Sequence, residues 1–115
     1  MHEMGIAMQI IEIASSSIPA EMENPSVARV NIRVGKLTAV VPSSLTFCFN
    51  IAAQETPLAG AELSIEEVPV VARCRKCGHE WTISGPDFSC ENCGDGDVDL
   101  LSGRELEIVS LELAQ

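Results

Sequence analysis

The 115-residue sequence has few basic residues. Seven Lys and Arg residues stand against 17 Asp and Glu residues, which gives a net charge of −10 at pH 7. Proteins that bind the phosphate backbone use Lys and Arg to displace its counterions. This charge balance therefore weighs against nucleic-acid binding, and it suits a soluble protein whose partner is basic or cationic.

The sequence also lacks a long apolar run. Its N-terminal segment contains several apolar residues, but Glu3 and Glu12 interrupt them and no basic stretch precedes them. This pattern is not that of a membrane-spanning helix or of a secretory signal. We expect a cytoplasmic protein whose cysteines are reduced.

Motifs of catalysis and of nucleotide binding are missing as well. There are only two histidines, and no Ser/His/Asp or Cys/His arrangement and no glycine-rich phosphate loop can be recognised. We expect a protein that is not an enzyme, and any nucleotide-driven step must then come from a partner.

What the sequence does contain is two Cys-x-x-Cys pairs, Cys74/Cys77 and Cys90/Cys93, each followed directly by Gly. Paired knuckles of this kind typically supply the four ligands of a tetrahedral zinc site. A rubredoxin-like iron site would use the same four sulfurs, and two disulfides would need an oxidising compartment. Because four thiolates leave no open position on the metal, we expect a structural zinc site rather than a catalytic one.

Three basic residues, Arg73, Arg75 and Lys76, cluster at the first knuckle. A basic face there would favour a zinc-ribbon nucleic-acid module. Since the rest of the chain is acidic, we expect these residues to balance the charge of the thiolates instead.

Apolar periodicity predicts a helix over residues 3–16 and a second helix over residues 42–54. Met4 and Met8 belong to the apolar stripe of the first helix, and we expect them to fill the core rather than to bind a soft metal. The second helix begins at Pro42, and its inward face includes Cys48, for which we expect a buried, inert thiol.

Alternation of apolar and polar residues predicts strands at residues 30–34 and 62–66, a short return strand at 98–101 and a last strand within 104–113. The parity of apolar residues changes in the last strand, which indicates a β-bulge or an edge strand buried on both sides, with a helix as the alternative. Thr56-Pro57 predicts one further short turn of helix.

These elements predict an α+β fold: a two-layer domain with an approximately three-stranded sheet and two helices, carrying an inserted four-cysteine zinc-ribbon lobe. The α/β domain comprises residues 1–70 plus 103–115, and the zinc-binding domain comprises residues 71–102.

The N-terminal tripeptide Met1-His2-Glu3 is a candidate site for a transient metal. The α-amine of Met1, the amide nitrogen of His2 and its imidazole can together bind a metal in a plane, which suits Ni(II) or Cu(II) better than Zn(II). Glu3, His79, water or a partner's ligand could fill the fourth corner. The alternatives are a solvated terminal histidine and, for His79, a polar loop residue with ordinary hydrogen bonds.

Several segments along the chain together form a recognisable pattern. They are Met1-His2-Glu3 followed by the helix through Ile6, Val30 to Gly35 followed by Pro42, Leu45 and Phe49, Ala61 to Pro69, both Cys-x-x-Cys pairs, and Ser102-Gly103-Arg104-Glu105-Leu106. With these segments the chain resembles the HypA/HybF family of nickel metallochaperones, which assist the maturation of NiFe-hydrogenases.

The resemblance implies that His2, with the α-amine of Met1 and nearby backbone nitrogens, binds Ni(II), and that Glu3 lies at the nickel site or at a docking surface. It implies structural zinc on Cys74, Cys77, Cys90 and Cys93. It further implies a HypB-type GTPase partner, which fits the missing phosphate loop, and delivery to the precursor of the hydrogenase large subunit, with urease maturation factors as further possible partners.

Overall fold

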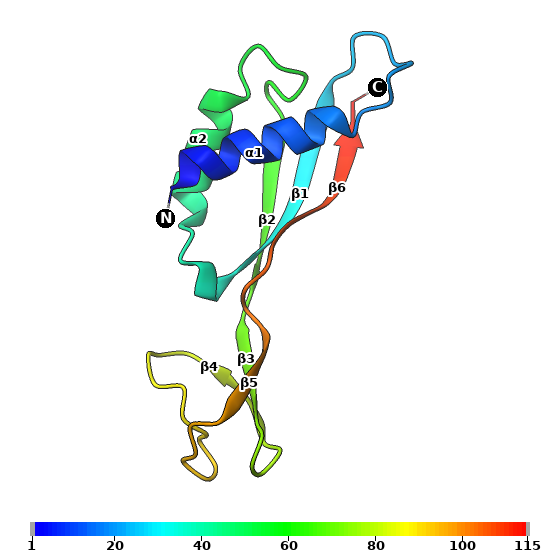
Figure 1. The fold of residues 1–115 in the computed structure, drawn as a ribbon. Helices are drawn as coiled ribbons and strands as arrows, with labels where there is room; N and C mark the ends of the chain where they lie inside the picture. Colours follow the sequence, from blue (N-terminus) through cyan, green and yellow to red (C-terminus); the bar gives the residue numbers. More distant parts are fainter. Residues whose placement is uncertain (1, 115) are drawn as a thin grey trace. The chain divides into compact units, whose positions relative to one another are not determined.

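A computed structural model describes residues 2–114 of the chain. Its helices and strands are α1 (Glu3–Ser16), β1 (Val27–Gly35), the 3-10 helix η1 (Lys36–Thr38), α2 (Pro42–Ala52), β2 (Glu62–Val68), β3 (Val70–Cys74), β4 (Glu80–Ile83), β5 (Val98–Ser102) and β6 (Leu106–Leu113) (Figure 1). The chain forms two compact units, the first of Met1–Arg33, Val40–Glu66 and Glu107–Gln115, the second of Val34–Ala39 and Glu67–Leu106.

The first unit combines α1 and α2, which pack against each other, with a three-stranded sheet in the order β2-β1-β6. Its core contains Ala7, Ile10, Ile11 and Ala14 from α1, Leu45 and Phe49 from α2, and Val30 and Ile32 from β1. On β1 these buried residues alternate with the partly exposed Arg29, Asn31 and Arg33. The predicted two-layer α+β architecture is confirmed.

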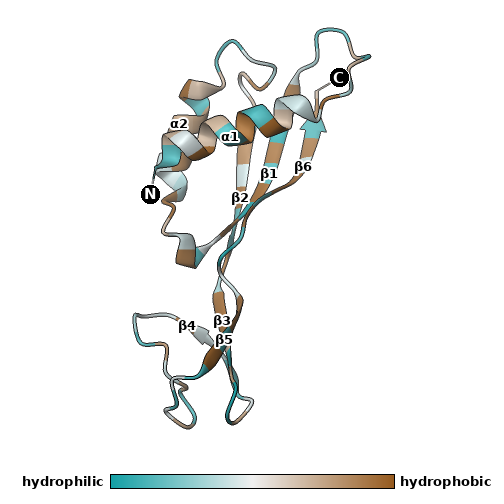
Figure 2. Ribbon diagram, in the orientation of Figure 1, coloured by the Kyte–Doolittle hydropathy of each residue, from teal (hydrophilic) through white to brown (hydrophobic). Residues whose placement is uncertain are grey.

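Helix α1 has the predicted bounds, but the prediction that its methionines fill the core is wrong. Met4 is 39% and Met8 59% exposed, whereas Ala7 and Ile11 are buried. A helix that packs on one surface buries only the arc of side chains that faces it, and Met4 and Met8 lie at the margin of that arc. Figure 2 shows hydrophobic and hydrophilic segments alternating along α1.

Helix α2 begins at Pro42, as predicted. Cys48, however, is only half-buried, so the prediction of a buried thiol is wrong. Thr56-Pro57 begins a single hydrogen-bonded turn that does not continue as a helix: the Thr56 hydroxyl accepts the N–H of Leu58 at 3.1 Å, as an N-cap side chain does, and the Thr56 carbonyl accepts the N–H of Ala59 at 3.0 Å.

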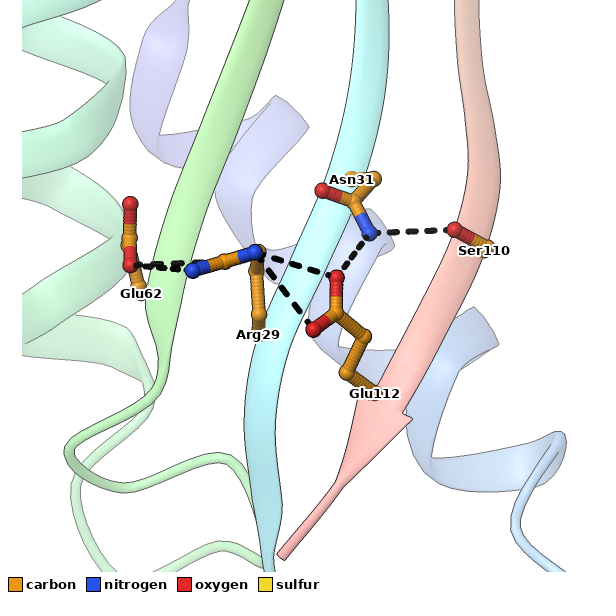
Figure 3. Close-up of polar contacts among 5 residues, drawn as sticks. All are labelled: Arg29, Asn31, Glu62, Ser110 and Glu112. Carbon is orange, nitrogen blue, oxygen red and sulfur yellow. Dashed lines mark hydrogen bonds and ion pairs between the residues drawn. The ribbon is translucent and has the colours of Figure 1, made fainter.

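A ladder of polar side chains joins the three strands of this sheet (Figure 3). Arg29 of β1 binds Glu62 of β2 at 3.3 Å and Glu112 of β6 at 3.2 Å. Next to it, the side-chain amide of Asn31 donates to Ser110 and to Glu112, both at 3.0 Å. Each of these contacts joins neighbouring strands, so the ladder supports their register.

The ion pairs of β1 with β6 continue along the strand. Arg29 and Arg33 are four residues apart on β1, but their β6 partners, Glu112 and Glu107, are five apart. Long side chains can reach diagonal as well as direct cross-strand neighbours, so the predicted β-bulge stays a prediction. The alternative of an edge strand buried on both sides is wrong, because residues such as Val109 are 57% exposed.

The second unit contains a three-stranded antiparallel sheet in the order β4-β3-β5. Val70, Ala72 and Ile83 are buried between its strands, with Trp81, Phe88, Val98 and Leu100 packed around them. Strand β5 was predicted, whereas β3 and β4 were not, because these short strands carry no extended apolar alternation of their own.

A close approach of two glycines lies where η1 meets the segment after β5. The N–H of Leu37 donates to the carbonyl of Gly103 at 2.9 Å, and the N–H of Gly35 donates to Glu105 at 2.7 Å. A Cβ atom on Gly35 would overlap the backbone of Gly103. Only glycine therefore permits these two segments to touch here.

Candidate metal centre

The four cysteines of the two knuckles come together in the second unit. The Sγ atoms of Cys74, Cys77, Cys90 and Cys93 all lie within 4.8 Å of one another. Across the two knuckles, Cys74 is 3.6 Å from Cys93 and Cys77 is 3.7 Å from Cys90. A tetrahedral ion with metal–sulfur bonds of about 2.3 Å requires sulfurs about 3.8 Å apart. The predicted cluster thus forms, with spacings that suit a tetrahedral metal such as zinc.

Each knuckle is a tight turn that closes on its first cysteine. Gly78 donates its N–H to the carbonyl of Cys74 at 2.9 Å, and Gly94 donates to Cys90 at 2.8 Å. The φ angles of these glycines are +80° and +79°, which side chains other than glycine rarely adopt. The glycine after each pair is therefore what lets the backbone turn around the sulfurs.

Several N–H groups point at the sulfurs. The backbone N–H groups of Asn92 and Cys93 each donate to the Sγ of Cys90 at 3.4 Å, and the side-chain amide of Asn92 donates to Cys77 at 3.7 Å. The role of Asn92 was missed in the sequence, where Cys-x-x-Cys spacing identifies ligands but not the residues that support them.

Two of the four thiols have shifted pKa values. The backbone N–H of His79 and then the amide of Asn92 lower the pKa of Cys77 to about 6. The N–H of Asp95 acts in the same direction on Cys93, but desolvation and the neighbouring sulfurs outweigh it and raise its pKa to about 12. Since four thiolates so close together repel one another, a cation between them is what would ionise the whole set.

A disulfide interpretation of these cysteines is wrong. All five cysteines of the chain are free, and sulfur separations of 3.6 and 3.7 Å far exceed the bond of about 2.05 Å. Iron and zinc share the same tetrahedral sulfur geometry, so both metals fit the cluster.

Two of the three basic residues beside the first knuckle, Arg73 and Arg75, bind carboxylates. Arg73 binds Glu80 at 2.9 Å, while Arg75 binds Asp97 at 3.3 Å and also Asp99. For these two arginines the expectation that they balance the thiolates is wrong, because each guanidinium pairs with carboxylates; for Lys76 it stays a prediction. These pairs also leave less positive charge for a phosphate backbone.

His79 follows the first knuckle and makes ordinary polar and stacking contacts. Its Nε2 lies 2.8 Å from the Glu91 carboxylate, and its ring stacks on Trp81 with a centroid distance of 5.8 Å. These contacts match the interpretation of a polar loop residue. A nickel-ligand role for His79 stays a prediction.

The N-terminal candidate site lies in the first unit, and Met1 itself lies outside the described residues. His2 is exposed and occupies the N-cap position of α1, where its carbonyl accepts the N–H of Ile6 at 3.2 Å. The carboxylate of Glu3 accepts the backbone N–H of Val41 at 3.2 Å. This bond is the main reason why the pKa of Glu3 is lowered.

Among residues 2–114, no helix is long and apolar enough to cross a membrane.

The α+β fold and the four-cysteine cluster define a small metal-binding protein with two structural units. Solved structures share this fold. "Solution structure of the Ni metallochaperone HypA from Helicobacter pylori" superposes with a TM-score of 0.65 at 23% identity, covering 98% of this chain and 97% of that one. "Solution structure of HypA protein" gives 0.70 at 23% identity, covering 98% and 96%.

Sequence comparison identifies the family. The profile described as "Hydrogenase/urease nickel incorporation, metallochaperone, hypA" matches residues 1–113. "Hydrogenase maturation factor HypA" of Desulfosudis oleivorans is 78% identical over 115 residues and covers 100% of both chains. The protein of the same name from Desulfatibacillum aliphaticivorans is 59% identical, covering 99% of this chain and 88% of its own. The chain belongs to the HypA family of nickel-incorporation metallochaperones.

Proposed function

We propose that this chain binds Ni(II) at its N-terminus and delivers it to the large-subunit precursor of a NiFe-hydrogenase, acting with a HypB-type GTPase. The observation that carries the proposal is the match of the whole chain to a nickel-incorporation family. The exposed position of His2 at the start of α1 supports it, because a cargo ion must be accessible for transfer.

The proposed nickel ligands are the α-amine of Met1, the backbone nitrogen of His2 and its imidazole, with Glu3 next to the site. Three nitrogens in one plane suit Ni(II) and leave a fourth corner for water, His79 or a partner's ligand. Transfer then proceeds by ligand exchange as a partner's ligands enter that corner. Protons compete with the metal for these nitrogens, so acid favours release.

We propose that the four-cysteine cluster holds zinc as a resident structural ion. The support is the near-tetrahedral sulfur spacing and the N–H donors of Asn92 and Cys93. Zinc bound there would link two turns that contribute few buried apolar residues, so its binding energy would be folding energy for the second unit. Under this proposal residues 71–102 serve zinc and residues 1–70 plus 103–115 serve nickel.

The place of action that we propose is the cytoplasm, where thiols stay reduced. The chain has no phosphate-binding loop of its own, so nucleotide hydrolysis falls to the GTPase. Urease maturation factors are further proposed partners, in keeping with the family's description.

The decisive experiment is metal analysis and calorimetric nickel titration of the untagged protein, of His2→Ala and of His79→Ala. We expect one zinc in each protein and one further nickel in wild type. His2→Ala loses that nickel because the imidazole is gone, while its zinc and helical content stay unchanged.

Extension of the chain before Met1 should likewise impair nickel binding, because the α-amine becomes an amide. Stoichiometric nickel binding by His2→Ala would contradict the assignment of His2 as a nickel ligand. The alternative function would then be that of a zinc-stabilised acidic adaptor. Loss of nickel in His79→Ala alone would move the site to the second unit. A red, redox-active protein as isolated would show iron in the cluster.

A further inference from the structure

The third residue of the chain makes a contact that links the starts of the two helices. Glu3 is the first residue of α1, and its Oε2 atom lies 3.2 Å from the backbone nitrogen of Val41. Val41 is the N-cap residue of α2. Residues 38 positions apart are thereby joined within the first unit.

This contact gives the N-terminus of α2 a carboxylate acceptor that its own residues do not provide. The first turn of a helix has N–H groups without partners, and a Ser, Thr, Asp or Asn at the N-cap usually accepts one of them. Val41 has no such side chain, and α2 has neither a side-chain cap nor an acidic residue in its first turn. The Glu3 carboxylate brings an acceptor and a negative charge to the N-terminus of α2, where the helix dipole favours both.

The same contact restrains the residue that follows His2. The carbonyl of His2 is held by the N–H of Ile6 at 3.2 Å, and the next side chain is held by Val41. The backbone on the C-terminal side of the chelating dipeptide is thus anchored by two hydrogen bonds, one within α1 and one to α2. A chelate built on an anchored backbone loses less conformational entropy when the metal binds.

We propose that Glu3 is a positioning residue that holds the N-terminal chelate at the start of α2, and that its carboxylate stays on Val41 instead of binding nickel. This inference rests on the proposed nickel function and deepens it. It removes the Glu3 carboxylate from the candidates for the fourth corner of the nickel plane, because that carboxylate is engaged with Val41.

Two substitutions separate positioning from ligation. Glu3→Gln keeps an oxygen that can accept the Val41 N–H but makes a poor metal ligand, whereas Glu3→Ala removes both functions. Glu12→Ala on the exposed side of α1 is the matched control for the loss of one negative charge. Nickel affinity is measured by calorimetry on untagged proteins, with far-ultraviolet circular dichroism to check that each variant is folded.

We expect Glu12→Ala to bind nickel as wild type does and Glu3→Gln to bind it within about threefold of wild type. Glu3→Ala should bind on the order of tenfold more weakly, because the N-terminal backbone is then no longer anchored and must be ordered when the metal binds. Equal losses in Glu3→Gln and Glu3→Ala would show that the carboxylate is a ligand. Unchanged affinity in both would overturn positioning while leaving the nickel function in place. If wild type binds no nickel, the proposed function itself fails.

Hydrogen–deuterium exchange at the Val41 amide gives a readout independent of affinity. We expect slow exchange in wild type with and without Ni(II), similar exchange in Glu3→Gln, and faster exchange in Glu3→Ala. Exchange that accelerates when nickel is added to wild type would show the carboxylate leaving Val41 for the metal, and it would overturn the proposal.

Discussion

Two phenylalanines on α2 show how strongly the position of a single residue decides its contribution. Phe49 is fully buried in the core of the first unit, whereas Phe47, two positions earlier, is 67% exposed. A step of two residues turns a side chain about 200° around a helix, so the two rings face opposite sides. The same side chain is therefore core at one position and surface at the other.

We predict that Phe49→Ala lowers the free energy of unfolding by about 3–5 kcal/mol, because it removes buried area and leaves a cavity. Phe47→Ala is the matched control and should change it by less than about 0.5 kcal/mol. Urea unfolding followed at the helical circular dichroism signal measures this, since both α-helices lie in the first unit. Equal effects of the two substitutions would contradict the assignment of the core.

At the scale of elements, β1 is held between β2 and β6 by ion pairs as well as by backbone bonds. Glu112 of β6 accepts from Asn31 and Arg29, and these partners lower its pKa below the usual value of 4.5. A carboxylate whose pKa is lowered by folding stabilises the protein above its unfolded-state pKa. That contribution is lost as the pH falls through the folded-state value.

We therefore predict that Glu112→Gln is slightly less stable than wild type at neutral pH and that the difference shrinks as the pH falls below about 4.5. The effect is small because the pair is exposed to solvent and screened by salt. Glu21→Gln, on the exposed connection after α1, is the control. The free energy of unfolding is measured by urea unfolding at the helical circular dichroism signal. A stability difference between Glu112→Gln and wild type that grows in acid would refute this account.

At the scale of the whole molecule, the two units differ in what stabilises them. The first has a core drawn from two helices and a sheet, whereas the second has a small apolar cluster around the buried Val70, Ala72 and Ile83. Small units with so little core usually depend on a metal or a covalent link. Loss of the metal should therefore affect the second unit far more than the first.

If the cluster holds zinc, as we propose, Cys93→Ser should lose it, and limited proteolysis should then cut between residues 75 and 97 while the helices survive. Cys48→Ser is the matched control, because Cys48 is a free cysteine outside the cluster, and it should keep both zinc and protease resistance. Chelation of wild-type zinc should reproduce the Cys93→Ser pattern. A second unit that resists protease without metal would argue against a structural role for the ion.

The sequence by itself determined the elements whose signals are local. Helix and strand periods and tight turns are properties of short segments. A few neighbouring residues therefore predict the apolar repeat of α1, the start of α2 at Pro42, the alternation in β1 and the two Cys-x-x-Cys pairs, each followed by Gly. The fold class and the four-cysteine cluster were therefore predictable.

Only the tertiary structure decided which apolar residues are core, which charges are paired and where Glu3 binds. Met8 and Ile11 belong to the same predicted stripe, yet one is exposed and the other buried, because the surface that covers a helix comes from distant segments. Arg75 was expected to face the thiolates and instead binds Asp97 and Asp99. Such contacts join residues far apart in the chain, and nothing in the local pattern specifies them.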